Sequence, residues 1–184
     1  MSLETNRLLL RQWQRADYAP FAELNADPNV RRFFPKVQTP EESNADAQII
    51  HDFIARKGWG LWAVELKESA EFIGFVGLFE PTAALPFSPC VEIAWRLRKE
   101  HWGSGYATEA GAKALSYAFE TLALDEVISM AVVSNAPSIA VMTRLGLQDA
   151  KQNFAHPDIP LEHELSEHVL YKITREQWLS QLSL

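Results

Sequence analysis

The chain has 184 residues and a formal net charge of −7, with 17 Lys and Arg against 24 Asp and Glu. This length suits one domain with a full hydrophobic core. A content of 47% hydrophobic and 22% charged residues is ordinary for a soluble globular protein. The acidic balance argues against nucleic-acid binding, because no basic run offsets it. It mildly favours cationic partners such as amines, although plain solubility is the preferred explanation.

The single cysteine, Cys90, excludes an internal disulfide and a cysteine-rich metal cluster. The sequence begins without a signal peptide, and no apolar run approaches the roughly 18 residues of a membrane span. We therefore expect a cytoplasmic protein that does not interact with membranes and holds no metal.

The first part of the chain alternates between strand-like and helix-like stretches. A strand is predicted over 7–13, a helix over 15–27, a short aromatic segment over 28–35 and a helix over 39–57. The last of these has the clearest start, because Thr39 suits the N-cap, Pro40 the first helical position and Glu42 the capping-box position. Its buried face is expected to comprise Ala45, Ile49, Phe53 and Ile54.

Strand-like runs then dominate. Residues 61–66, 72–79 and 91–97 predict an antiparallel meander. The remaining elements are expected as a helix over 105–122, a strand over 126–133, a helix over 135–145, strands over 147–154 and 166–173, and a tail helix over 175–182. These elements predict a single domain over 1–184 of the α/β class, with helices flanking a mixed central sheet of about six to seven strands.

The stretch 91–115 organises the chain. A buried strand leads through a short basic turn and two glycines, Gly103 and Gly105, into a helix. The first N–H groups of a helix have no intrahelical partners, and glycines let the backbone approach an anion closely, so this turn predicts a phosphate site. The sequence lacks GxxxxGK[ST], and GxG is not continued by xxG, which disfavours P-loop and dinucleotide-binding sites. A tight strand–helix turn without a ligand is the alternative.

A second polar stretch lies at the start of the predicted helix 135–145. Asn135 is a natural N-cap, with Ser138 in the first helical turn. Gly146 and Leu147 fit the C′ and C″ positions of a Schellman motif. On these residues alone, Asn135 and Ser138 could simply cap the helix.

Together these motifs resemble the GNAT N-acetyltransferase superfamily. The resemblance rests on Glu92-Ile-Ala-Trp-Arg-Leu97, on Trp102-Gly-Ser-Gly-Tyr-Ala-Thr-Glu-Ala110, and on Asn135-Ala-Pro-Ser138 through Leu147. The family signature is Q/R-x-x-G-x-G/A, and Trp102 departs from its first position. The closest branch is the ribosomal-protein (RimJ/RimL-like) one, which is resembled by Thr5-Asn-Arg-Leu-Leu-Leu-Arg11 and His168-Val-Leu-Tyr171. This chain has Lys99 at a position where that branch usually has proline.

The resemblance implies a GNAT-like fold with a splayed pair of strands and acetyl-CoA as cosubstrate. The N–H groups from Gly103 to Thr108 would hold the pyrophosphate, and the strand edge around Trp95 to Leu97 would pair with the pantetheine arm. The Leu97 N–H would polarise the thioester carbonyl, and Asn135 would bind the pantetheine. The implied cofactor-binding residues are Trp95, Arg96, Leu97, Gly103, Ser104, Gly105, Tyr106, Ala107, Thr108, Asn135 and Ser138.

Catalysis requires a group that removes a proton from the acceptor amine. Glu92 is the first candidate base, and a structural carboxylate is the equal alternative. His156 is the rival base, because histidine titrates in the useful range. Ser138 would protonate the departing thiolate. His163 and His168 are weaker candidates whose scatter suggests surface positions.

The expected partner is a primary amine, either a protein N-terminus or a small molecule. Its specificity should come from the Phe33-Phe34-Pro35 segment, the helix near Thr39, and the loops at 81–89 and 156–164. Trp59 and Phe87 could line that site, whereas Trp62 is expected in the core. A non-catalytic acyl-CoA-binding sensor is the alternative function, and the sequence leaves open whether the protein is a monomer or a homodimer.

Overall fold

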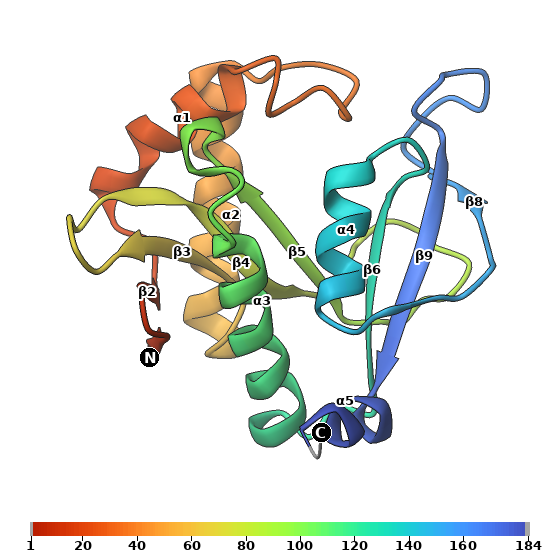
Figure 1. Ribbon diagram of the computed structural model, residues 1–184. Coiled ribbons are helices and arrows are strands. Elements are labelled where there is room, and N and C mark those ends of the chain that lie inside the picture. Colours follow the sequence, from red (N-terminus) through yellow and green to blue (C-terminus); the bar gives the residue numbers. More distant parts are fainter. Residues whose placement is uncertain (1, 183–184) are drawn as a thin grey trace. The chain divides into compact units, whose positions relative to one another are not determined.

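The computed structural model describes residues 2–182, which belong to two compact units (Figure 1). Unit 1 consists of Met1–Leu78 and Ala94–Ala114, and unit 2 consists of Phe79–Ile93 and Leu115–Leu184. Strand β5 (Glu92–Leu97) contributes its first two residues to unit 2 and its last four to unit 1.

Unit 1 is built on strands that follow one another in the order β1-β2-β3-β4-β5. The strands preceding β5 are β1 (Leu3–Glu4), β2 (Leu8–Arg11), β3 (Leu61–Leu66) and β4 (Phe72–Phe79), and they pair antiparallel. The helices are α1 (Tyr18–Ala26), α2 (Pro40–Lys57) and α3 (Tyr106–Ser116). In Figure 1, α2 passes behind the strands and α3 passes in front of them.

Helix α2 begins as the sequence predicts. Thr39 Oγ1 accepts a hydrogen bond from the Glu42 N–H at 3.2 Å, and Glu42 Oε2 accepts one from the Thr39 N–H at 2.9 Å. The expected buried face is only partly correct, because Ile54 is buried but Ile49 is 67% exposed, whereas Ser43 and Ala47 are fully buried. Helix α2 packs against α1 through the face that carries the small residues Ser43 and Ala47, and tertiary contacts determine which face is buried.

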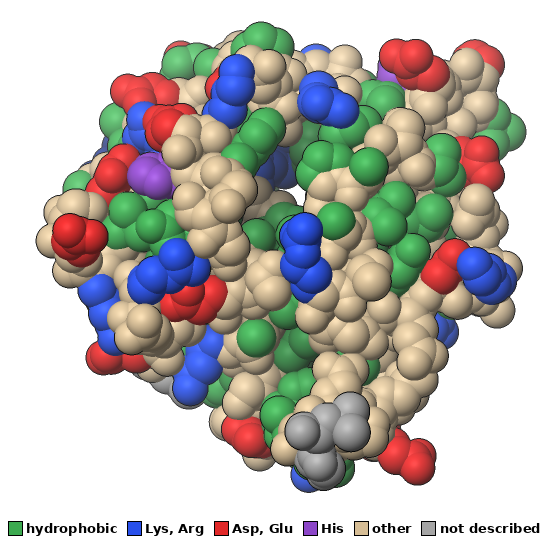
Figure 2. Space-filling view, in the orientation of Figure 1, with side chains coloured by type: hydrophobic (Ala, Val, Ile, Leu, Met, Phe, Trp, Pro, Cys, Tyr) green, Lys and Arg blue, Asp and Glu red, His purple; other side chains and the backbone are tan. Residues whose placement is uncertain are grey.

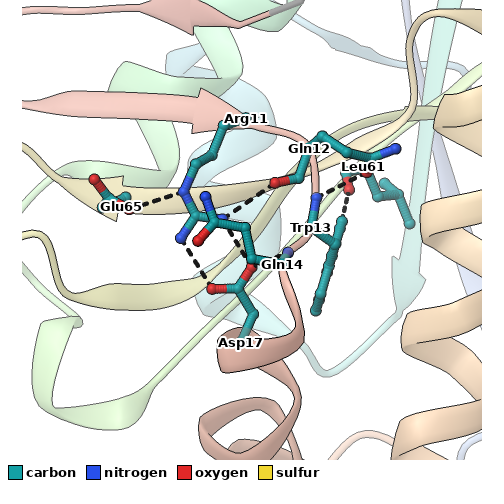
Figure 3. Close-up of polar contacts among 7 residues, drawn as sticks. All are labelled: Arg11, Gln12, Trp13, Gln14, Asp17, Leu61 and Glu65. Atoms are coloured by element: carbon teal, nitrogen blue, oxygen red, sulfur yellow. Dashed lines mark hydrogen bonds and ion pairs between the residues drawn. The ribbon is translucent and has the colours of Figure 1, made fainter.

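A buried ion network fixes the start of α1 to the sheet (Figure 3). The Arg11 guanidinium binds both carboxylate oxygens of Asp17, at 2.7 and 2.9 Å, and its Nε binds Glu65 at 2.8 Å. Trp13 Nε1 donates to the Leu61 carbonyl at 2.8 Å. Because Asp17 is 2% exposed, the bidentate geometry satisfies a carboxylate that would otherwise be costly to bury.

Aromatic side chains fill the core of unit 1 between α1 and the strands. Trp13 and Phe21 meet edge to face with ring centroids 4.8 Å apart, and Phe72 and Phe75 also contact Phe21. Trp62 is fully buried, which confirms its expected place in the core. Such packing of aromatic rings contributes both apolar burial and favourable ring geometry.

Unit 2 is organised around β6 (Glu126–Val132) and β9 (Glu167–Thr174), which pair antiparallel along their whole length. Two short strands, β7 (Gln148–Asp149) and β8 (Phe154–Ala155), also pair with β9, and β5 joins β6 in parallel at Glu92 and Ile128. The helices are α4 (Ala136–Arg144) and α5 (Arg175–Gln181), as Figure 1 shows. Ile93, Ile128, Leu170 and Ile173 form the centre of its core.

The observed class is α/β with a mixed sheet, as predicted, but the described residues form nine strands, more than the expected six to seven. The extra strands are short. The expected strand over 147–154 is wrong, because β7 and β8 are separated by a turn in which Lys151 has φ 55°. The predicted helix over 105–122 is α-helical only to Ser116 and then widens into a π-helical turn, Tyr117–Thr121.

The described residues include no helix that is long and apolar enough to cross a membrane. On the face shown in Figure 2, acidic and basic side chains are interspersed, with hydrophobic side chains between them.

Candidate active site

The turn between β5 and α3 has the backbone that an anion site requires. Gly103 and Gly105 both adopt left-handed conformations, with φ of 74° and 80°. A Cβ built on Gly103 would meet no atom within 4 Å, so the backbone there borders open space. Helix α3 starts at Tyr106, directly after the glycines, and its first N–H groups have no intrahelical acceptors. The turn therefore fits a phosphate group on both geometric and electrostatic grounds.

Arg7 also contributes to this turn, and reasoning from the sequence did not single it out. Its guanidinium lies over the Tyr106 ring, 4.4 Å from the centroid, and a Cβ on Gly105 would be 3.6 Å from Arg7 Nη2. Arg7 Nε binds Glu109 at 2.7 Å, and the same carboxylate accepts from Thr5 Oγ1 at 2.6 Å. The Thr5-Asn-Arg7 motif near the start of the chain was the sequence signal that could have pointed to Arg7. Arg7 therefore places a guanidinium group beside Gly105, with its charge shared with Glu109.

The end of β5 exposes main-chain groups on one edge. The Arg98 N–H donates to the Ile73 carbonyl at 2.8 Å, so Arg98 faces β4. Successive residues of a strand point their main-chain groups to opposite sides, and Leu97 and Trp95 therefore face away from β4, whereas Arg96 faces it. Trp102 Nε1 donates to the Leu97 carbonyl at 2.9 Å. This bond explains the departure from the family signature, because the indole holds the turn onto the strand end.

The other predicted residues of this segment occupy accessible positions in unit 1. Ser104 is exposed in the turn, and Ala107 and Thr108 are partly exposed in the first turn of α3. His101, also in the turn, lies 3.1 Å from Glu71 through Nε2. The unit thus brings together the strand edge, the glycine turn and Arg7.

In unit 2, Glu92 is a buried carboxyl group. The residue is 5% exposed, and Oε2 has no hydrogen-bond partner among the described residues. Burial raises the pKa of Glu92 to about 8, although a hydrogen bond from the Met130 N–H opposes this shift. The Ile128 N–H donates to the Val91 carbonyl, and Ser129 Oγ donates to the Ile93 carbonyl, so the backbone on both sides of Glu92 is held.

A carboxyl group in this state can take up and release protons near neutral pH. A free glutamate is fully ionised there and is a weaker base. One carboxyl oxygen makes no hydrogen bond with any described residue, and a perturbed carboxyl group of this kind is a candidate for proton transfer.

Asn135 and Ser138 lie together at the start of α4, also in unit 2. Asn135 Oδ1 accepts from the Ser138 N–H at 3.3 Å, which confirms Asn135 as the N-cap. At the other end, the Leu147 N–H donates to Met142 and the Gly146 N–H to Thr143, each at 3.0 Å, which is the predicted Schellman motif. Both Asn135 and Ser138 are partly exposed, so their side chains remain accessible to a ligand.

His156 belongs to an aromatic cluster rather than to an isolated loop. Its ring centroid is 5.0 Å from that of His168, which in turn is 5.7 Å from Phe154. The expectation that His168 lies on the surface is wrong, since it is 8% exposed. Burial lowers the pKa of both histidines, so neutral rings are favoured.

Cys90 does not have the environment of a catalytic nucleophile. Burial raises the pKa of its thiol, and the charge of Glu92 adds to this effect, so the reactive thiolate is disfavoured. No group of three His, Cys, Asp or Glu residues in the described part of the chain could hold a metal ion.

Comparison with known proteins gives a consistent family assignment. Residues 7–148 match the model of the acetyltransferase (GNAT) domain. An uncharacterized N-acetyltransferase of Bacillus subtilis, YnaD, is 27% identical over 97% of this chain and 99% of its own length. The FsC-acetyl coenzyme A-N(2)-transacetylase of Aspergillus fumigatus is 34% identical over 85% of this chain and 69% of its own length.

Solved structures agree on the fold. A GNAT-family acetyltransferase from Bacillus anthracis superposes with a TM-score of 0.79 at 24% identity, covering 96% of this chain and 99% of the other.

Proposed function

Because the chain belongs to the GNAT acetyltransferase family, we propose that it transfers an acetyl group from acetyl-CoA directly to a primary amine. The observation that carries this proposal is the buried Glu92, whose pKa of about 8 suits a general base for an amine. The donor is supported by the glycine turn, and by a relative whose name specifies acetyl coenzyme A.

The residues of the chain fit the parts of acetyl-CoA, which supplies an activated thioester. The N–H groups of Gly103 to Thr108, together with Arg7, would bind the pyrophosphate. The main-chain groups of Trp95 and Leu97 that face away from β4 would pair with the amide-bearing pantetheine arm, with Asn135 as a further partner. Arg96 would take no part in this pairing through its backbone, because its main-chain groups face β4.

The proton and bond changes balance as follows. Glu92, directly or through a water molecule, takes a proton from the ammonium form of the acceptor. The amine nitrogen then forms a bond to the acetyl carbon, and the carbon–sulfur bond breaks. The Leu97 N–H stabilises the negative charge that develops on the carbonyl oxygen. The Ser138 hydroxyl gives a proton to the departing thiolate, and the second proton that the nitrogen loses as it becomes an amide restores that hydroxyl. His156 is the alternative base, because a neutral imidazole can accept a proton.

Two classes of acceptor follow from the resemblance: a protein N-terminus, as in the ribosomal-protein branch, and a small amine. In this proposal the two units act as one acetyltransferase domain in the cytoplasm. The alternative of a non-catalytic acyl-CoA sensor makes the opposite prediction about Glu92, since a sensor needs no base.

The experiment is mass-spectrometric detection of acetyl transfer from acetyl-CoA to N-terminal peptides, polyamines, amino acids and aminoglycosides, with a parallel thermal-shift titration of acetyl-CoA. A gain of one acetyl group on one class supports the proposal. Binding of acetyl-CoA without transfer to any acceptor would support the sensor, and the absence of binding would refute both.

A further inference from the structure

Two arginines and an exposed phenyl ring form a cluster in unit 1, in which Arg31 and Phe34 lie on the segment between α1 and α2 and Arg96 lies on β5. The guanidinium carbons of Arg31 and Arg96 lie 4.1 and 4.6 Å from the centroid of the Phe34 ring. The Arg96 guanidinium also lies 5.2 Å from the Phe75 ring. Phe34 is 39% exposed, so the cluster borders the surface.

The positive charge of this cluster has no counter-ion in contact with it. Among residues 2–182, no carboxylate lies within ion-pair distance of Arg31 or Arg96, although Asp46 influences both electrostatically. Burial, with a contribution from Arg31, lowers the pKa of Arg96 to about 9, so the guanidinium remains protonated at neutral pH. Arg31 is 8% exposed and Arg96 is partly exposed. Holding two like charges side by side and largely away from water without a counter-ion is costly for the free protein.

The hydrogen-bonding capacity of Arg96 is also incompletely used. Nη1 donates to Asn25 Oδ1 at 2.9 Å, whereas Nε is buried and has no acceptor among the described residues. A second unpartnered atom, Gln38 Oε1, lies on the segment between α1 and α2 that also carries Arg31 and Phe34. The Gln38 N–H donates to the Asn25 carbonyl at 3.0 Å. Unsatisfied buried donors and acceptors are rare in folded proteins, and a water, an ion or a polar ligand can supply the missing partner.

We propose that Arg96, reinforced by the charge of Arg31, binds a carboxylate group of the acceptor, which is therefore a small amine of the amino-acid class. Arg96 immediately precedes Leu97 on β5, so the side chain that would hold the carboxylate comes from the residue next to the main-chain group that we assign to the acetyl carbonyl. A carboxylate matches the planar guanidinium and supplies the missing charge. This inference rests on the proposed function.

The first test compares matched amines as acceptors of the purified full chain. The twenty standard L-amino acids are assayed with acetyl-CoA, and the best is then compared with its carboxamide and its decarboxylated amine. We expect kcat/KM to fall roughly 30-fold or more when the carboxylate is removed. Equal rates for acid and amine would overturn the inference while leaving the acetyltransferase activity intact.

The second test removes the charge. Arg96→Met should abolish the preference for the carboxylate but leave the thermal shift produced by acetyl-CoA unchanged. Arg15→Met is the matched control, because Arg15 lies over the Tyr18 ring at 4.8 Å, in the same unit and outside the cluster. A preference retained in Arg96→Met, or lost equally in Arg15→Met, would overturn the assignment.

Two further comparisons separate the remaining outcomes. β-Alanine and 2-aminoethylphosphonate differ only in the anionic group, and faster acetylation of the phosphonate would overturn the choice of a carboxylate. If no acceptor is acetylated, the thermal shift of the CoA complex is measured with the amino acids and their decarboxylated amines. Stabilisation by the acids alone, lost in Arg96→Met, supports the anion site even then, and no stabilisation overturns it.

Discussion

The indole Nε1–H of Trp102 donates a hydrogen bond to the carbonyl oxygen of Leu97 at 2.9 Å. This bond joins the start of the glycine turn to the end of β5. It therefore holds the peptide group that follows Leu97, and the N–H of the same residue is the group that we assign to the acetyl carbonyl. The position that departs from the family signature is therefore used to hold two parts of the proposed acetyl-CoA site in register.

Trp102→Phe should raise KM for acetyl-CoA by roughly three- to tenfold, which corresponds to the net value of one hydrogen bond. The phenyl ring keeps most of the apolar contact and loses only the donor. Trp13→Phe is the matched control, because Trp13 Nε1 makes the same type of bond to the Leu61 carbonyl. The control should lower the midpoint of thermal unfolding without changing KM. An unchanged KM in Trp102→Phe would contradict this role.

Glu92→Gln should lower kcat/KM by about 10²- to 10⁴-fold at neutral pH, since general base catalysis is lost. In the wild-type enzyme the rate should rise as pH passes through about 8, where Glu92 becomes ionised. The variant should recover partly at alkaline pH, where free amine is abundant. A pH–rate profile of both proteins measures this, and unchanged profiles would transfer the role to His156 or to solvent.

Glu92 should also make stability depend on pH. Its pKa is raised from 4.5 to about 8 on folding, so the native state binds more protons than the unfolded state between these values. The stability of the wild-type protein contributed by this group is present below pH 4.5 and is lost as pH rises through about 8. Glu92→Gln should therefore unfold a few degrees higher than wild type at about pH 8, with little difference at about pH 4.5. Thermal melts of both proteins across this pH range measure the effect. A difference in melting temperature that stays constant with pH would disprove the raised pKa of Glu92.

Gly105→Glu should reduce acetyl-CoA affinity by more than about 100-fold, because it places a negative charge where the pyrophosphate would bind. The residue has φ 80°, so any side chain also introduces strain. Gly105→Ala controls for that strain, about 1–2 kcal/mol, without adding charge. Calorimetric titration of both variants should show much weaker binding for the glutamate variant only. Similar losses in both would mean that backbone conformation, not charge, is responsible.

Local signals in the sequence were sufficient for the elements that carry their own boundaries. Thr39 and Glu42 form the predicted capping box, and Asn135 with Gly146 encloses α4 as expected. The same kind of signal located the glycine turn before α3. Each of these features depends on hydrogen bonds between residues that are close in sequence, so the residue types alone specify the geometry.

Features that depend on distant partners were not accessible in this way. The buried side of α2 is set by what α1 presents to it, and so Ile49 is exposed despite its helical spacing. Residues 147–154 carry strand-like side chains but are divided between β7 and β8, both of which pair with β9. Periodicity cannot distinguish these outcomes, because it describes one segment at a time.

The sequence by itself determined the caps and the glycine turn, because these rest on local backbone chemistry, and its resemblance to a known family pointed to the family and the fold. Only the tertiary structure decided the state of the ionisable groups. Within residues 2–182, Glu92 is buried with an unpartnered oxygen, His156 lies against His168, and Arg96 lies over Phe34 without a counter-ion. A pKa or an unsatisfied charge is a property of the surroundings, and the chain assembles those surroundings from residues that lie far apart in the sequence.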